Sequence, residues 1–158
     1  MRAPLRTTLL IAAGHAVVRV LALLGLERLL VDGRLDGLLR PLGLYSDDPL
    51  GAGLTAFMLI AAGAGLLALA DGLLRRRATA PWLQVAVWGV VCVAYGVASA
   101  LTSHASGTSD DLVFTVLLMG GLAAFGAVPG IATGTAVRLA LTPTRRPTAD
   151  PVPVPGDH

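Results

Sequence analysis

The sequence has little charge, few aromatic residues and a single cysteine. Charged residues make up 14% and apolar residues 54% of its 158 residues, whereas charged residues are about 25% of an ordinary soluble domain. A chain so poor in polar groups lacks the means to cover a soluble core. The low charge therefore indicates a membrane protein with several spans.

The scarcity of cysteine and histidine excludes several kinds of redox and metal chemistry. Cys92 has no second cysteine to pair with, so an intrachain disulfide, a CxxC centre and a cysteine metal cluster are excluded. His15 lies in the first long apolar segment, His104 in a polar loop and His158 at the end of the chain. One chain therefore does not supply two haem ligands at the same depth of a membrane. The motifs GxxxxGK[ST], GxSxG and HExxH are also missing. We expect no cofactor and no resident metal, and the sequence favours a non-enzymatic protein without settling the point.

Four apolar segments dominate the remainder of the chain. Each is close to or above the roughly 20 residues that a helix needs to cross hydrocarbon, and in lipid the backbone must satisfy its own hydrogen bonds. The sequence therefore predicts an all-α membrane protein with four transmembrane helices in one domain over residues 1–141. The predicted spans are residues 7–26, 51–74, 81–101 and 112–137.

The C-terminal segment has a different composition from the rest of the chain. Residues 142–158 contain five prolines and almost no large apolar side chains. Such a segment cannot bury enough apolar surface to fold. We expect residues 142–158 to be a disordered, proline-rich cytoplasmic tail.

The arginines indicate how the predicted helices are oriented. All twelve basic residues are arginines, which together with the excess of alanine, glycine, leucine and valine indicates a bacterial genome of high GC content. Cytoplasmic loops carry an excess of basic residues, and alternating spans place most of the arginines on one side. The arginines on that side are Arg2, Arg6, Arg75, Arg76, Arg77, Arg138, Arg145 and Arg146. The pattern predicts a multi-pass protein of the bacterial plasma (inner) membrane with both termini in the cytoplasm.

Two loops have features beyond this topology. Arg75, Arg76 and Arg77 are expected to attract anionic lipid headgroups, at about 1 kcal/mol per residue near the membrane surface. The stretch "ERLLVDGRLDGLLRPLG" in the first outer loop has leucines near helical spacing with charges between them. We interpret it as a short amphipathic segment on the outer surface, interrupted at Gly33 and Gly37.

The N-terminus allows one alternative interpretation. Arg2 and Arg6, followed by "LLIAA" and "AGHA", resemble a secretory signal peptide with a small-residue cleavage site. Because the apolar sequence continues well beyond that site, we favour a first transmembrane span over a cleaved signal.

Arg19 is the most unusual residue of the first span. It lies about midway between Arg6 and Asp32, and an arginine at the centre of a membrane helix costs about 2.5–3.5 kcal/mol on insertion scales. Such a residue usually faces the protein interior or a polar cavity. His15, four residues earlier, shares its helical face. No acid lies in the interior of a predicted span; Asp71, near the cytoplasmic end of the second span, is about two to three turns from the depth of Arg19.

The sequence leaves three roles for Arg19 open. In the first it extends to the membrane surface or donates to free carbonyls near Pro129, and His15 is a neutral packing residue. In the second, Arg19 and His15, with Gln84 of the third span at a similar depth, bind an anionic or carbonyl-bearing lipid-like molecule. In the third, Arg19 pairs with an acid on another subunit or protein.

Small residues are the second notable pattern within the spans. Gly126, Gly130 and Gly134 form a GxxxGxxxG run in the fourth span, a spacing that lets helix backbones approach closely. Small residues in the second and third spans offer complementary faces. The run predicts helix packing inside one four-helix bundle, with a homo-oligomer interface as the alternative.

These patterns favour one function and leave two others open. The favoured function is a non-enzymatic accessory or ligand-binding role, in which the Arg19–His15 face holds a lipid-like molecule. The alternatives are a subunit of a small oligomeric transporter and a component of a membrane redox or lipid-modifying enzyme. The expected partners are membrane lipids, a second copy of the chain or another membrane protein, and no nucleic acid.

Overall fold

Helices make up all the regular secondary structure of the described residues. The computed structural model describes residues 2–42, 48–74 and 81–141, and within these ranges there is no strand. Four helices are long, and two short helical segments follow the first of them. In chain order the elements are α1 (Arg2–Val31), α2 (Asp36–Leu39), the 3-10 helix η1 (Arg40–Leu42), α3 (Pro49–Leu74), α4 (Pro81–Ala105) and α5 (Leu112–Leu141).

The four long helices are each long and apolar enough to cross a membrane, which confirms the prediction of an all-α fold with four potential spans and is compatible with a small multi-pass membrane protein. Their bounds differ from those predicted, most clearly in the first helix. The predicted span stopped at residue 26, but α1 continues to Val31. The chain leaves the helix only near Gly33, whose positive φ of 65° suits glycine.

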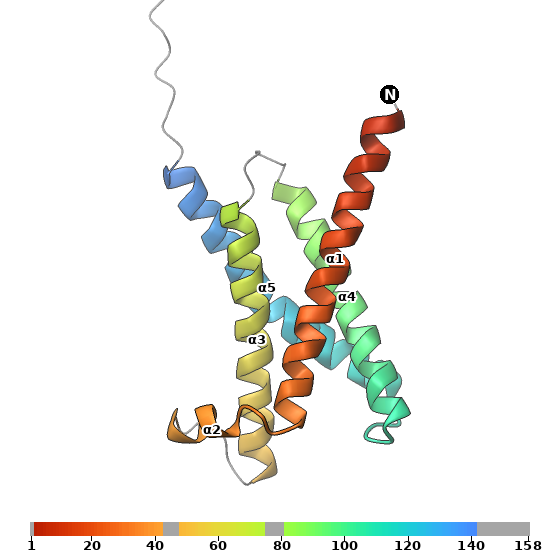
Figure 1. The fold of residues 1–158 in the computed structure, drawn as a ribbon, viewed down its shortest axis with the longest axis vertical. Helices are drawn as coiled ribbons and strands as arrows, with labels where there is room; N and C mark the ends of the chain where they lie inside the picture. Colours follow the sequence, from red (N-terminus) through yellow and green to blue (C-terminus); the bar gives the residue numbers. More distant parts are fainter. Residues whose placement is uncertain (1, 43–47, 75–80, 142–158) are drawn as a thin grey trace, which may run out of the picture.

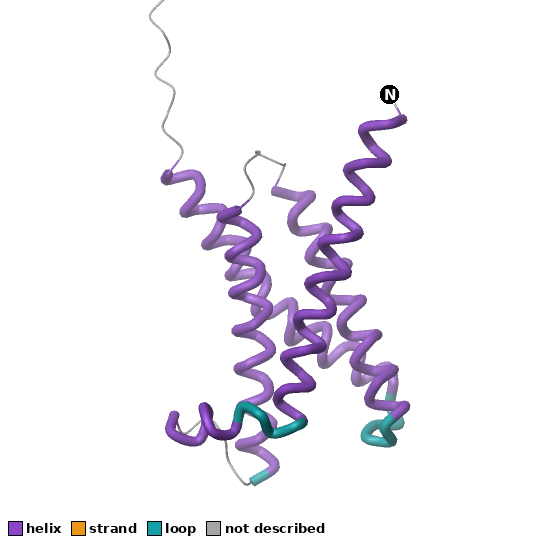
Figure 2. The backbone as a smooth tube through the Cα atoms, viewed as in Figure 1, coloured by secondary structure: helices purple, strands orange, loops and turns teal. Residues whose placement is uncertain are grey.

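The two ends of the described chain lie at the same end of the bundle. In Figure 1 the start of α1 and the end of α5 are at the same end of the bundle, which we call the terminus end. The connections from α1 to α3 and from α4 to α5 are at the opposite end, which we call the loop end (Figure 2). Helix α5 runs behind the other helices at a strong tilt. An even number of spans accounts for this arrangement.

Aspartates at the loop end cap the starts of α3 and α5, and a glycine follows the end of α4. The carboxylate of Asp48 accepts a 2.6 Å hydrogen bond from the Gly51 amide at the start of α3. Asp111 accepts one of 2.9 Å from the amide of Phe114 at the start of α5. These are N-terminal caps, which satisfy amides that have no partner within the helix. Helix α4 ends at Ala105, and the φ of 68° at Gly107 allows the chain to turn back.

Helices α3 and α5 are in backbone contact through small residues. A methyl group at Gly126 would collide with the carbonyl of Ala61, and one at Gly130 with the carbonyl of Gly65. At Gly134 a methyl carbon would lie only 3.0 Å from a backbone carbonyl of α3. The glycine run therefore faces α3 of the same chain, where close van der Waals contact replaces the hydrophobic effect that is missing in lipid.

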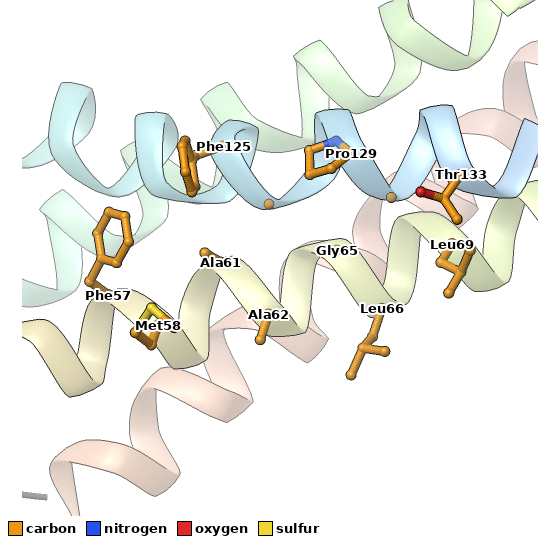
Figure 3. A pocket seen from close by; sticks show the side chains of 12 residues that line it. Phe57, Met58, Ala61, Ala62, Gly65, Leu66, Leu69, Phe125, Pro129 and Thr133 are labelled. Carbon is orange, nitrogen blue, oxygen red and sulfur yellow. The ribbon is translucent and has the colours of Figure 1, made fainter. Parts of the chain in front are cut away.

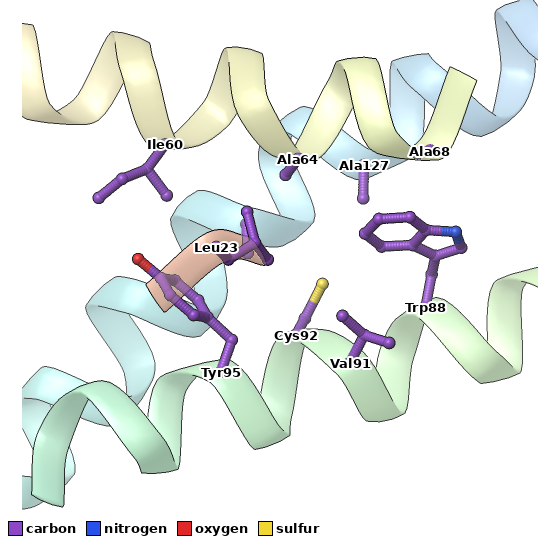
Figure 4. Packing of buried hydrophobic residues seen from close by; sticks show 10 residues of the cluster. Leu23, Ile60, Ala64, Ala68, Trp88, Val91, Cys92, Tyr95 and Ala127 are labelled. Atoms are coloured by element: carbon purple, nitrogen blue, oxygen red, sulfur yellow. The ribbon is translucent and has the colours of Figure 1, made fainter. Parts of the chain in front are cut away.

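The buried cluster lies between α4 and the helices around it. Figure 4 shows Trp88 and Tyr95 projecting from α4, with Leu23 of α1 and Ile60 of α3 beside them. Helix α1 contributes little else that is fully buried. Only 11% of an 18-residue apolar window within Leu9–Val31 of α1 is buried inside the protein, against 39% of such a window within Trp82–Ala105 of α4. Helix α1 is therefore attached to the side of a more tightly packed group formed by α3, α4 and α5.

The predicted amphipathic segment is divided by the structure. Its first residues, Glu27 to Val31, belong to α1, and a turn at Gly33 separates them from α2 and η1. Figure 1 shows α2 extending sideways from the bundle at the loop end. Leu39 is its one buried residue among those with described side chains. Arg75–Arg77 and the predicted tail, residues 142–158, lie outside the described residues.

Candidate functional site

Arg19 forms an ion pair with Asp71 inside the bundle. The guanidinium Nη2 contacts the Asp71 Oδ1, and each side chain is only 7% exposed. The expectation that no acid lies within reach of Arg19 was therefore wrong. None of the three roles considered from the sequence included an acid in the same chain.

The direction of the side chains explains why the expected separation was too large. Side chains of a helix lean toward its N-terminus. Helix α1 runs from the terminus end to the loop end and α3 runs the opposite way. Arg19 consequently leans toward the terminus end and Asp71 toward the loop end, so the two converge. Distances along the helix axes did not include this convergence or the length of the arginine side chain.

Trp88 of α4 completes a network of three residues from three helices. Its indole Nε1 donates a 3.3 Å hydrogen bond to Asp71 Oδ2, and the guanidinium carbon of Arg19 lies 5.2 Å from the centre of its ring. The second contact has the geometry of a cation–π interaction. Asp71 and Trp88 thus both compensate the buried charge of Arg19, which would be costly in lipid without them.

The other two residues of the predicted ligand site lie in different environments. His15 is exposed on the outside of α1, whereas Arg19 is buried. The four-residue spacing placed both on one helical face, but the bundle covers only the part of that face nearer the loop end. Gln84 is buried, and its Nε2 has no hydrogen-bond partner among the described residues. The structure therefore does not bring His15 and Arg19 together into one site.

A second polar cluster lies nearer the loop end. Ser99 of α4 donates a 2.7 Å hydrogen bond to the Glu27 carboxylate of α1. Tyr95 is fully buried one turn away, with its hydroxyl next to Glu27 and Ser99. That hydroxyl makes no hydrogen bond of standard geometry with a described residue. Glu27, Ser99 and Tyr95 therefore form one polar cluster between α1 and α4.

Helix α1 carries both clusters on one face. Arg19, Leu23 and Glu27 follow one another at four-residue spacing, which advances each by about 6 Å along the axis. Leu23 is 1% exposed and Val91 of α4, in the same cluster, is fully buried. The contact between α1 and α4 is therefore polar at two levels and apolar between them.

A cleft opens beside Glu27 at the loop end. It lies between α1, α4 and the first turns of α5, and its volume is about 300 Å³. Leu24, Val31 and Met119 supply its apolar lining. Its polar lining consists of Glu27, Arg28, Thr102, Ser103, Ser106 and Thr108. The cleft therefore combines charges of both signs, several hydroxyl groups and an apolar wall.

A larger groove lies between α3 and α5 on the outside of the bundle (Figure 3). Its volume is about 520 Å³, and Thr133 supplies the one side-chain polar group among its lining residues. Phe57 and Phe125 meet at one end, with ring centres 5.6 Å apart. An apolar groove of this kind accommodates hydrocarbon but has no group that would select one molecule over another.

Comparison with known proteins adds no relative. No protein family matches the sequence, and none of the curated proteins and none of the solved structures is detectably similar to the chain. Within the described ranges, no three histidine, cysteine, aspartate or glutamate side chains come together as a metal site. The function must therefore be argued from the geometry alone.

Sequence reasoning missed Glu27 and Trp88 and misjudged Asp71. Glu27 was assigned to the outer loop because the first span was ended too early, although its eight-residue separation from Arg19 places both on one helical face. No local sequence pattern indicates the contact between Trp88 and Arg19, because the two residues come from different helices.

Proposed function

We propose that the protein is a non-enzymatic membrane protein that binds a lipid-like molecule in the cleft beside Glu27. The observation that carries this proposal is the composition of the cleft. Glu27, Arg28 and the hydroxyl groups suit a polar headgroup, whereas Leu24, Val31 and Met119 suit the chain attached to it. Ligand sites typically combine such apolar walls with a few placed polar groups.

The way in which α1 is attached also supports a binding role. Helix α1 is the least buried of the four long helices, and polar contacts to α3 and α4 contribute to its docking. A helix attached in this way separates from its neighbours more easily than one in continuous backbone contact. Movement of α1 would widen the cleft, because Leu24, Glu27 and Val31 form one of its walls.

This proposal moves the ligand site away from Arg19. A free arginine inside a membrane protein would attract an anion, but the charge of Arg19 is already balanced by Asp71. His15, the other half of the expected site, faces outward. We therefore assign Arg19 a structural role and assign ligand binding to the loop end.

We further propose the membrane and the orientation. The arginine distribution favours the plasma membrane of a bacterium with both termini in the cytoplasm. The position of both described ends at one end of the bundle supports their lying on the same side of the membrane. Reporter fusions after residue 158 and after residue 107 test the orientation, since only the second should show extracytoplasmic activity. A homo-oligomer would need a surface other than the glycine run, because α3 covers that face.

Native mass spectrometry of the full-length protein tests the binding function. The protein would be released from mild detergent as wild type, as Ser103→Trp, which fills the cleft, and as Leu101→Trp. Leu101 is 58% exposed on the same helix and serves as the control. The proposal expects a retained lipid mass in the wild type and in Leu101→Trp but not in Ser103→Trp. Wild-type protein without any retained lipid would contradict it, and so would lipid that survives Ser103→Trp.

A further inference from the structure

We infer that the cleft selects a zwitterionic phospholipid whose headgroup carries a primary ammonium group next to its phosphate. This inference rests on the proposed function, and it adds the chemical class of the ligand. It is carried by two features: the carboxylate of Glu27 held against α4, and the cation of Arg28 beside it.

The Glu27 carboxylate is positioned to accept hydrogen bonds from an ammonium group. Ser99 already donates to Oε2 at 2.7 Å, which fixes the carboxylate and leaves its remaining lone pairs for a ligand. An ammonium group offers three donors, so it can bond both the carboxylate and a hydroxyl oxygen of the cleft lining, such as that of Thr102 or Ser103.

Arg28 supplies the complementary charge for the phosphate. It follows Glu27 directly in α1, and both side chains line the cleft. Arginine binds phosphate oxygens in a planar, two-pronged geometry. Hydroxyl groups of Ser103 and Thr102 also border the cleft. One headgroup with adjacent positive and negative charges would therefore meet a partner for each.

The same lining disfavours other common headgroups. Proteins recognise quaternary ammonium groups through aromatic faces, and the cleft has no aromatic residue in its lining. A headgroup with a phosphate and no cation would leave Glu27 facing a like charge, which is unfavourable at short distance. The chemistry thus separates phosphatidylethanolamine from phosphatidylcholine and from phosphatidylglycerol.

Competition between lipids tests the inference. Full-length protein would be offered equal amounts of phosphatidylethanolamine, phosphatidylcholine and phosphatidylglycerol with identical acyl chains, and retained masses would be read by native mass spectrometry. We expect at least about tenfold more bound phosphatidylethanolamine than either competitor, since charge-assisted hydrogen bonds distinguish them. Glu27→Gln should abolish the preference. Asp32→Asn, with the same charge change at an exposed site outside the cleft, should keep it.

The outcomes separate this inference from the proposed function. Equal retention of all three lipids, lost in Ser103→Trp, would overturn the headgroup selection and leave the binding function standing. No retained lipid of any kind would overturn both. Displacement by free phosphoethanolamine at equal concentration would show that a soluble compound, not a lipid, is the ligand and would also overturn the inference. The ranking in wild-type protein needs no variant, so a poorly folded Glu27→Gln does not weaken the test.

Discussion

The α3–α5 contact and the docking of α1 hold helices together in opposite ways. Between α3 and α5, glycines bring the backbones so close that an added methyl group would collide with a carbonyl. Helix α1 is instead joined to its neighbours by long polar side chains, through the Arg19–Asp71 ion pair and the Glu27–Ser99 hydrogen bond. The α3–α5 contact should therefore be weakened by substitutions that add atoms, and the attachment of α1 by substitutions that remove polar groups.

The difference shows how a small membrane protein can combine a fixed part with a separable one. In lipid, apolar side chains gain little by turning away from the solvent, so helices associate through close packing or through polar contacts. Close packing over several turns leaves no alternative arrangement. Polar contacts are few and directional, and a ligand can compete for them.

Replacement of Asp71 should produce the largest change. Asp71→Leu leaves the Arg19 charge buried without its carboxylate, and breaking one side of a buried ion pair costs about 3–5 kcal/mol. The free energy of unfolding in mixed detergent micelles measures the loss. Asp110→Leu, at an exposed position at the loop end, is the control and should change it by less than about 0.5 kcal/mol. Equal effects of the two substitutions on the free energy of unfolding would contradict the claim that the ion pair attaches α1.

An alanine in the glycine run should produce the next largest effect. Gly126→Ala forces α3 and α5 apart, and such overpacking costs about 1–3 kcal/mol. Gly121 lies on the same helix with no atom near its missing side chain. Gly121→Ala should be neutral or stabilising by up to about 1 kcal/mol, because alanine favours helix. Indistinguishable unfolding free energies for the two variants would contradict the close contact.

The single cysteine reports the docking of α1 directly. Cys92 is 6% exposed and lies in the buried cluster with Leu23 of α1 (Figure 4). A membrane-permeant maleimide should react slowly with the wild type. It should react about tenfold faster with Asp71→Leu, which corresponds to about 1.4 kcal/mol in the opening equilibrium. Gly126→Ala, which disturbs the contact between α3 and α5, should accelerate the reaction less. A larger acceleration in Gly126→Ala than in Asp71→Leu would mean that α1 does not shield Cys92 from the reagent.

Loss of the second polar contact should produce the smallest effect. Ser99→Ala removes the hydrogen bond to Glu27, and a hydrogen bond to a charged group contributes about 1.5–3 kcal/mol at most. Because Glu27 is only half-buried and borders the cleft, water can replace the hydroxyl and the loss should be about 1 kcal/mol. Unfolding in mixed micelles measures it. Ser106→Ala is the control, because this exposed hydroxyl makes hydrogen bonds only within the end of α4 and its loop. An effect as large as that of Asp71→Leu would place the main attachment of α1 at the loop end.

The sequence predicted the four long helices because span length and apolarity are properties of each segment alone. Their ends were less predictable, since α1 continues to Val31 without a breaker until Gly33. This extension changed the interpretation of Glu27 from a loop residue to a residue on the inner face of a helix. The identity of the residue was in the sequence, but its environment depended on where the helix ended.

The partners of Arg19 were beyond sequence reasoning for a different reason. Asp71 and Trp88 come from two other helices, and their contact with Arg19 depends on the relative depth and rotation of all three. The spacing of His15 and Arg19 predicted a shared face but not how far along that face the bundle extends. Helical periodicity gives the face of a residue, whereas tertiary packing determines which part of the face is covered.

A double-mutant cycle on Arg19 and Asp71 tests the central claim most directly. The unfolding free energies of wild type, Arg19→Met, Asp71→Leu and the double variant would be measured in mixed micelles, with Cys92 labelling as a second readout. Residues in contact commonly show interaction energies of about 0.5–3 kcal/mol, and we expect a larger value here, because Asp71→Leu alone should cost about 3–5 kcal/mol. The double variant should be close to the wild type, since apolar residues often replace a buried ion pair without loss. Additive effects, with a coupling energy near zero, would contradict the claim that this ion pair attaches α1 to the rest of the protein.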